Sequence, residues 1–179
     1  METTLDLAGS RDADTALINA ARDGDRAAFD ALFERHKRFV YNVCLRILGP
    51  GEDAVDACQS TFVKAYRRLS VFRGDACFRT WLYRIAVNIS VGLARKEKHR
   101  HPAGLSASPE TGSHAMEDTV REAMLDLPPD VRAILVLFYF HGLSCEELAE
   151  ALGCSEGAAR VRLHRARKLF RKIYQEISR

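Results

Sequence analysis

The sequence has no long hydrophobic run and no sign of a secretory leader. No stretch approaches the roughly twenty consecutive apolar residues that a membrane-spanning helix needs. The first residues, from Met1 to Leu7, are acidic and lack the hydrophobic segment of a signal peptide. We therefore expect a cytoplasmic protein.

The cysteines lack the close pairing that metal sites use. The chain has five, at Cys44, Cys58, Cys77, Cys145 and Cys154, and no two are spaced as C-x-x-C, although zinc sites usually need such pairing. Cys44 and Cys58 fall on apolar faces of predicted helices, which favours buried packing. The other three are expected to be more accessible. No metal or cofactor is expected.

Strand patterns and the motifs of common enzyme sites are also absent. No segment alternates apolar and polar residues as a half-buried strand does, so the sequence predicts an all-α fold. It contains no nucleophile motif, phosphate-binding loop or set of paired metal ligands. This disfavours an enzyme or a metal sensor, and we expect neither catalytic residues nor a small-molecule substrate.

Charge is distributed unevenly along the chain. The net charge of the 179 residues is +3, but residues 101–130 are acidic and the segments on either side are basic. Basic surfaces attract the phosphates of nucleic acids, which repel an acidic connector. The pattern suits two nucleic-acid-facing modules joined by a tether.

Proline, glycine and serine gather in residues 99–119, where no apolar periodicity appears. This composition predicts a flexible linker between two small helical domains, 14–98 and 120–175. In the first domain, apolar spacing predicts helices over residues 14–22, 27–48, 52–69 and 78–98.

Two further predictions concern individual residues. The helix over 52–69 is expected to bury Val55 and Tyr66 along its apolar stripe. In the second domain, a short helix over 120–127 ends at two prolines, after which Asp130 can cap an almost wholly apolar helix that runs through Phe140.

Residues 142–170 have the sequence form of a DNA-reading helix-turn-helix. Leu148 and Leu152 point inward at helical spacing, Gly153 permits the turn, and Ser155 can cap the second helix. That helix carries arginines from its first turn, where such helices meet base edges in the major groove. The alternative is a solvated basic helix, which the coincidence of turn, cap and first-turn arginines disfavours.

Both domains together resemble the sigma-70 superfamily of bacterial RNA polymerase specificity subunits, and specifically its extracytoplasmic-function group. The resemblance rests on EDAVDACQSTFVKAY at 52–66, Phe-Arg-Gly at 72–74, TWLYRIAVN at 80–88 and RVRLHRAR at 160–167. It implies a protein that binds core RNA polymerase and directs promoter-specific transcription initiation. Such a protein reads the minus-ten and minus-thirty-five elements, helps open the duplex and does no chemistry itself.

The resemblance assigns roles to three sets of residues. Docking on core polymerase falls to the third helix, through Asp53, Asp56, Gln59, Phe62 and Lys64. Minus-ten DNA, including a flipped base that needs an aromatic pocket, falls to Phe72, Arg73, Asp75, Arg79, Trp81, Arg84, Asn88, Arg95 and Lys96. The minus-thirty-five element falls to Ser155, Arg160, Arg162, His164, Arg165, Arg167 and Lys168.

The implied partners are core RNA polymerase, promoter DNA and an anti-sigma factor. In many relatives the anti-sigma factor is membrane-bound, which would hold the inactive protein at the inner membrane face, whereas the active protein is nucleoid-associated. The alternative is an ordinary helix-turn-helix regulator whose first domain dimerises or senses a signal. Residues 53–93 favour the sigma factor, because a docking helix, an aromatic loop and a tryptophan helix are not needed for dimerisation.

Overall fold

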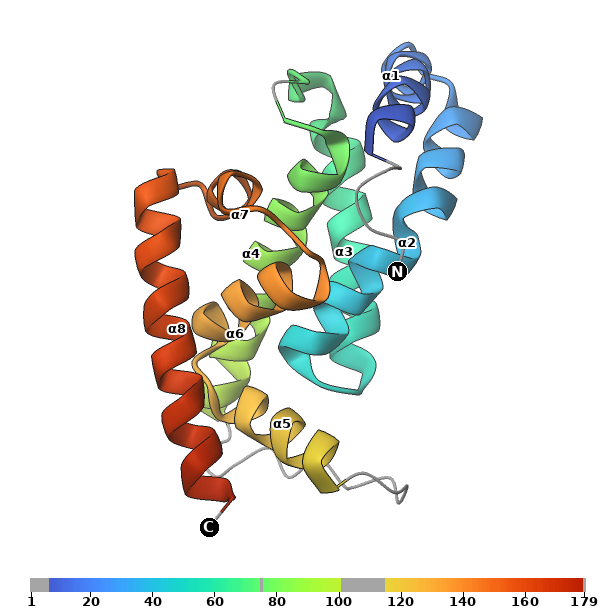
Figure 1. The fold of residues 1–179 in the computed structure, drawn as a ribbon. Coiled ribbons are helices and arrows are strands. Elements are labelled where there is room, and N and C mark those ends of the chain that lie inside the picture. Colours follow the sequence, from blue (N-terminus) through green and yellow to red (C-terminus); the bar gives the residue numbers. More distant parts are fainter. Residues whose placement is uncertain (1–6, 75, 101–114, 179) are drawn as a thin grey trace.

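The computed structural model describes residues 7–74, 76–100 and 115–178, and all of its regular structure is helical, as predicted (Figure 1). The first half contains α1 (Leu7–Arg22), α2 (Arg26–Leu48), α3 (Glu52–Arg68), the 3₁₀ turn η1 (Leu69–Val71) and α4 (Phe78–Arg100). The second half contains α5 (Ala115–Asp126), α6 (Pro129–Leu135), the π-helical turn η2 (Val136–Phe140), α7 (Cys145–Leu152) and α8 (Glu156–Ile177).

Several boundaries differ from the prediction. α1 begins at Leu7, upstream of the expected 14–22, and α4 continues to Arg100. α5 begins at Ala115, so the end of the segment predicted as linker is helical, which its composition of alanine, methionine and glutamate favours. Residues 101–114 of that segment lie outside the described residues. The division into two domains stays a prediction.

The start of α6 was predicted at the wrong residue. Pro128 occupies the N-cap position and Pro129 begins the helix, so Asp130 lies in the first turn and does not cap it. Proline suits this position because its fixed φ is already helical and its missing N–H would have no partner there. Asp130 is still placed favourably, since the helix dipole attracts negative charge to the first turn.

The core of the first half lies between α2, α3 and α4, each of which contacts the other two. Cys44 of α2 and Cys58 of α3 are both buried there, as predicted. Burial raises the pKa of the Cys44 thiol to about 11 and raises that of Cys58 as well. Both thiols therefore stay protonated near neutral pH and pack as small apolar side chains.

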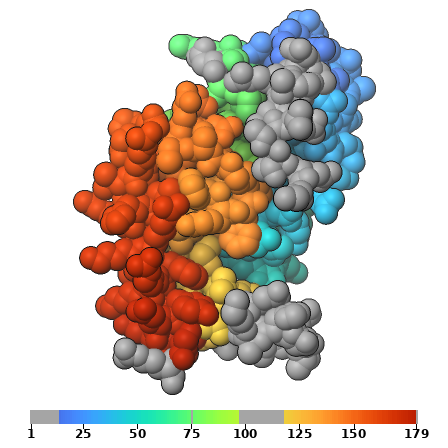
Figure 2. Space-filling view, viewed as in Figure 1, coloured from blue at the N-terminus to red at the C-terminus, as the bar shows by residue number. Residues whose placement is uncertain are grey.

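The second half packs directly against the first. α6 contacts α2 and α4 on one side and α8 on the other, so it lies between them (Figure 1). α7 also contacts α4. α8 forms one edge of the molecule, and its side chains project from that edge in the space-filling view (Figure 2). The described parts of the two halves thus share one continuous apolar core.

The predicted burial of Val55 and Tyr66 is wrong. Val55 is 43% exposed and Tyr66 is 48% exposed, the latter with its ring edge on Phe29 of α2. α3 instead meets its neighbours mainly through small side chains, which allow close approach; its buried residues are Ala54, Ala57, Cys58, Thr61, Phe62 and Ala65. The exposed face of α3 is therefore partly apolar.

α1 is fastened to α2 by a buried carboxylate. Asp14, 5% exposed, accepts hydrogen bonds from Arg35 Nη1 at 2.6 Å and, at 2.8 Å, from Nε2 of the buried His36. Burial alone would raise the pKa of Asp14, but the hydrogen bonds and charges of His36 and Arg35 outweigh it and lower the pKa below 3.8. The ionised carboxylate thus stabilises the fold.

We expect Asp14→Asn to lower the free energy of unfolding at neutral pH by about 1 to 3 kcal/mol, because a buried hydrogen bond to a charged group is lost. The lowered pKa makes this stabilisation complete above the ordinary value of 3.8 and lost as pH falls through the lowered value. Urea unfolding at a series of pH values should show variant and parent converging in acid. Asp30→Asn, at an exposed position of α2, is the control; an equal loss in both variants would contradict the role of Asp14.

Candidate nucleic-acid interface

The α7–turn–α8 segment is a helix-turn-helix closed by local hydrogen bonds. Ser144 and Glu147 form a capping box at the start of α7, with Ser144 Oγ accepting from the Glu147 N–H at 3.1 Å. Gly153 ends α7 in the left-handed region, at φ 64°, which favours glycine. Ser155 caps α8, as predicted, by accepting from the Ala158 N–H at 3.3 Å. Hydrogen bonds within this segment therefore fix where α7 ends and α8 begins.

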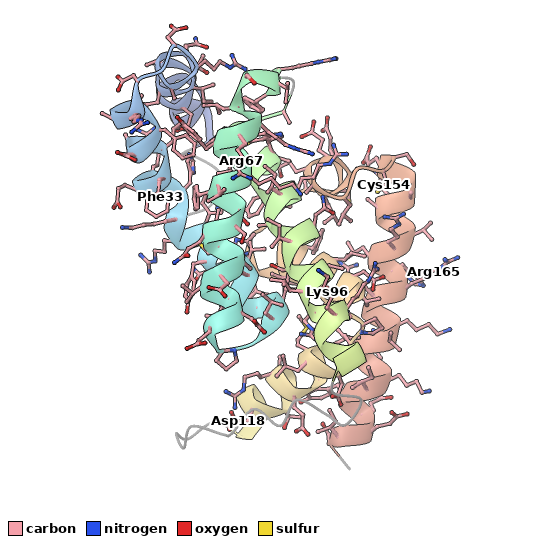
Figure 3. The ribbon with its side chains drawn as sticks, turned by 180° about the vertical axis from the view of Figure 1, so that it is seen from behind. Phe33, Arg67, Lys96, Asp118, Cys154 and Arg165 are labelled. Atoms are coloured by element: carbon pink, nitrogen blue, oxygen red, sulfur yellow. The ribbon has the colours of Figure 1, made fainter. Side chains whose placement is uncertain are left out.

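α8 buries a narrow stripe and exposes the predicted DNA-binding residues. Ala159, Leu163 and Ala166 are buried, and the exposed cations and polar groups are Arg160, Arg162, His164, Arg165, Arg167 and Lys168. Arg165 projects from α8 in the view from behind (Figure 3). This face carries five cationic side chains, a density that suits a polyanion such as DNA.

Two of these arginines already have partners in the protein. Arg160 Nη2 lies 2.5 Å from Glu156 Oε1 one turn earlier in α8. The guanidinium of Arg167 lies 5.0 Å from the Phe138 ring centroid and 5.4 Å from that of Tyr139, both in η2. Cation–π contact of this kind holds Arg167 against the protein. Arg162 and Arg165 are also exposed, and neither forms an ion pair within the described residues.

The residues predicted to dock on polymerase lie on or beside the exposed face of α3. Asp53, Asp56 and Gln59 are exposed and Lys64 is half-buried. Phe62 is only 5% exposed and packs edge-on against Phe33 of α2, at 4.7 Å between ring centroids. Phe62 therefore supports the face from beneath.

The predicted base-capture residues divide between core and surface. Phe72 is 7% exposed and packs on Phe78 and Trp81, with ring centroids 5.6 and 5.0 Å away. Trp81 is half-buried and Arg73 is exposed. Asp75 lies outside the described residues. Of the two predicted aromatics, Trp81 is thus the one with surface that a base could reach.

Arg79 and Lys96 occupy different environments on α4. Arg79 Nε donates to the Tyr83 hydroxyl at 3.0 Å, and its guanidinium lies 4.9 Å from the Phe39 ring centroid. Arg79 is therefore tied into the first half of the protein. Lys96, near the end of α4, is exposed (Figure 3).

Trp81 and Arg84 face the helix-turn-helix across a cavity of about 640 Å³. The opposite wall includes Glu150 of α7, Gly153 in the turn and Ser155 at the start of α8. The Arg84 guanidinium lies so close to the turn that a Cβ at Gly153 would be 3.0 Å from Nη2. The predicted minus-ten surface is thus partly covered by the second half.

A second cavity, of about 420 Å³, brings together predicted DNA-binding residues of both halves. Asn88 and Arg95 of α4 line it with Arg162 and Arg165 of α8. Arg95 also forms an exposed ion pair with Asp130, at 3.6 Å between Nη2 and Oδ1. The two predicted DNA-reading helices therefore face one another.

A buried arginine that the sequence argument missed connects the halves. Arg132 of α6 is 6% exposed and donates to the carbonyl oxygens of Ile47, Leu125 and Leu127. Desolvation by burial lowers its pKa to about 10, partly offset by Asp126, so it stays charged at neutral pH. The signal in the sequence was a lone cation inside an otherwise apolar run.

His141, which follows η2, makes a further polar contact between the halves. Its Nδ1 lies 3.2 Å from the hydroxyl of Tyr83 on α4. Burial, together with the positive charges of Arg79 and Arg46, lowers the pKa of His141 to about 4. Beside it, the Arg46 guanidinium lies 3.9 Å from the ring centroid of Phe140. His141 is therefore neutral near pH 7 in this arrangement.

Comparison with known proteins decides the family. Residues 32–100 match the profile of sigma-70 region 2, and residues 117–170 match that of sigma-70 region 4. RNA polymerase sigma-H factor of Pseudomonas aeruginosa is 33% identical, over 95% of this chain and 98% of that protein. ECF RNA polymerase sigma-E factor of Haemophilus influenzae is 32% identical, over 92% of this chain and 96% of that protein.

The chain belongs to the extracytoplasmic-function sigma factors of the sigma-70 family. As a sigma factor, it directs promoter-specific transcription initiation by RNA polymerase. Among solved structures, CnrH in complex with the cytosolic domain of CnrY covers 92% of this sigma factor and 98% of its own chain, with a TM-score of 0.68 and 29% identity. The sigma factor RpoE of Bartonella quintana shares the fold at 21% identity and a TM-score of 0.65, covering 82% of this chain and 96% of its own.

None of the helices in the described part of this sigma factor combines the length and apolar character that a membrane span requires. Region 2 and region 4, as matched, correspond to the α2–α4 and α5–α8 segments, respectively. The two contacts just described, through Arg132 and His141, therefore join region 4 to region 2.

We expect acid to weaken the contact between regions 2 and 4. A His141 exposed by separation would regain a pKa near the ordinary 6.5, so between that value and about 4 the separated state binds more protons than the closed one. Stability of the contact is then complete above pH 6.5 and decreases as pH falls toward 4. Small-angle scattering should show a larger radius of gyration at the acid end while far-UV circular dichroism is constant.

His141→Gln should abolish this pH dependence, whereas His164→Gln, at an exposed position on α8, should keep it. A radius of gyration that does not change with pH in the parent protein would contradict the role given to His141.

Proposed function

We propose that this sigma factor reads its promoters with two separate surfaces and docks on core polymerase with a third. The single observation that supports this most is α8, where a capped helix-turn-helix exposes Arg160, Arg162 and Arg165 from its early turns. Arginine forks match the O6 and N7 acceptors of guanine in the major groove. α8 would read the minus-thirty-five element. Arg162 and Arg165 are the proposed base readers, because Arg160 is paired with Glu156 and Arg167 packs on aromatic rings. Lys168 would hold phosphates.

Docking on core polymerase is assigned to the exposed face of α3. Asp53, Asp56 and Gln59 supply its polar groups, and Lys64 lies at its margin. The unexpected exposure of Val55 and Tyr66 supports this assignment, because apolar surface beside polar groups is typical of a protein-binding face.

Minus-ten recognition is assigned to Arg73, Asp75 and the DNA-facing side of α4. Trp81 would stack on a flipped base, since aromatic faces accept bases of any sequence. Phe72 would act from below by supporting Trp81. Arg84, Asn88, Arg95 and Lys96 would hold phosphates or base edges, and Arg79 would contribute charge from its place against Phe39.

Promoter engagement by α4 then requires regions 2 and 4 to separate. Arg84 lies against Gly153, and Trp81 lines the same cavity as Glu150 and Ser155. DNA cannot occupy that space while the helix-turn-helix does. Core polymerase would therefore bind a separated form in which both reading surfaces are uncovered.

Further expectations complete the proposal. The sigma factor would do no chemistry of its own and would work in the cytoplasm, at the nucleoid when active. An anti-sigma partner is proposed because the related CnrH was solved with the cytosolic domain of CnrY bound. A membrane-bound partner would hold the inactive protein at the inner membrane face.

Binding of the purified chain to sigma-free core polymerase, followed by run-off transcription from a cognate promoter, tests the proposal as a whole. Saturable binding with promoter-dependent transcripts is expected. Duplex binding by the chain alone, with no affinity for core polymerase, would favour an ordinary helix-turn-helix regulator.

The double variant Asp56→Ala, Gln59→Ala should lose affinity for core polymerase, because both side chains lie on the proposed docking face. Fluorescence anisotropy at fixed salt measures this. The control is Asp30→Ala, which removes an exposed carboxylate from α2. Unaltered affinity in the double variant refutes the docking assignment.

Arg162→Ala should cost about 1 to 3 kcal/mol in binding a cognate promoter and relax sequence preference at one position of the minus-thirty-five element. Holoenzyme binding to promoters varied at each base of that element measures both effects. Arg171→Ala, exposed near the C-terminal end of α8, should weaken binding without changing preference. An unchanged preference in Arg162→Ala would sink the base-reading role.

A further inference from the structure

Arg22, the last residue of α1, connects that helix to a distant segment of the chain. Its Nε donates to the Leu69 carbonyl at 3.1 Å, and its Nη2 donates to the Phe72 carbonyl. These acceptors lie 47 and 50 residues further along, at the start of η1 and directly after it. Leu69 O also accepts from the Phe72 N–H at 3.2 Å. One guanidinium thus spans the whole 3₁₀ turn.

The guanidinium is presented by a helix that is itself firmly held. Asp14 fastens α1 to α2 through Arg35 and His36, and Ile18 is buried. Asn19 Oδ1, one turn before Arg22, accepts from Nη1 at 3.3 Å. A cation at the end of a helix is also stabilised by the helix dipole. Arg22 is therefore positioned before it meets the turn.

The effect of this contact reaches Trp81 through one side chain. The Arg22 guanidinium lies 5.9 Å from the Phe72 ring centroid, and the same ring packs on Trp81 at 5.0 Å. Directly after the held carbonyl come the exposed Arg73 and then Gly74, whose φ is +82°. We call the Arg22 contacts with the Leu69 and Phe72 carbonyls the clamp. Because the exposed stretch follows Phe72 directly, the clamp sets where that stretch begins.

We infer that Arg22 is a positioning residue for promoter opening. It holds Phe72, and through Phe72 the indole of Trp81 and the start of the exposed loop, in the arrangement that receives a flipped base. The inference rests on the proposed minus-ten function of that loop. Arginine is required because its planar fork reaches two carbonyls at once, whereas the lysine ammonium is a single point charge.

Trp81 is the only tryptophan of the chain, so its fluorescence reports the clamp without polymerase. In Arg22→Ala we expect Trp81 emission to shift to longer wavelength and acrylamide to quench it more strongly, with Arg22→Lys intermediate. Far-UV circular dichroism should not change. Arg26→Ala, which removes an exposed cation at the start of α2, is the charge-matched control. Trp81 emission and quenching equal to the parent in both Arg22 variants would overturn the inference.

A second experiment uses holoenzyme on two templates, a duplex promoter and the same promoter already unpaired across the minus-ten element. Open complexes on the duplex, detected by permanganate reactivity, should fall about tenfold or more in Arg22→Ala, because each hydrogen bond from a charged group is worth about that factor and this variant loses two. The unpaired template should restore the parental yield, and core polymerase affinity should be unchanged.

Two results of this experiment would overturn the inference. One is an equal loss on both templates, and the other is a loss of core affinity; each assigns Arg22 a general structural role. If Arg22→Ala lowers the thermal midpoint of unfolding, the yields on the duplex and the unpaired template are compared with Arg22→Lys instead. A parent protein that neither binds core polymerase nor opens the duplex would contradict the proposed function instead, and the Trp81 measurement would still test the clamp.

Discussion

The buried guanidinium of Arg132 constrains how regions 2 and 4 of this sigma factor lie relative to each other. A charge removed from water must find acceptors, and leaving such a group unpaired costs about 3 to 5 kcal/mol. Arg132 finds acceptors on both sides: Leu125 and Leu127 in its own region, and Ile47 at the end of α2 in the other. The Arg132 hydrogen bonds therefore fix the position of region 4 on region 2. Apolar packing alone would allow the two regions to shift against each other.

Because region 4 packs on region 2, one surface of α4 contacts the second half in the closed chain and is proposed to contact DNA on a promoter. In the closed chain, Trp81 and Arg84 face the turn before α8, and Tyr83 meets His141. On a promoter, the proposed partners of Trp81 and Arg84 are a base and phosphates. The closed form is held by apolar packing of α6 on α2 and α4 and by a few polar and cation–π interactions beside it. Such an interface can stay closed in the free protein and still yield to a larger binding surface.

The sequence pattern predicted correctly those features that depend on interactions between residues close together in the chain. Gly153 and Ser155 act within four residues of themselves, so the helix-turn-helix could be predicted from them. Burial was harder, because periodicity identifies apolar residues without saying what covers them. Val55 and Tyr66 share the apolar stripe of α3, yet small residues make the close contacts and leave both exposed. For the same reason the pattern could not separate the covered ring of Phe72 from that of the half-exposed Trp81.

The sequence alone determined the helical class, the helix-turn-helix with its basic second helix, and the resemblance to extracytoplasmic-function sigma factors, since these depend on spacing, caps and residue type over short stretches. Only the tertiary structure decided that Arg22 holds the turn before the proposed minus-ten loop, that Arg132 joins the regions, and that the proposed DNA-reading faces of α4 and α8 line one cavity. Those contacts join residues up to 85 positions apart, and hydrogen-bond partners at such separations are set by the packing of whole helices.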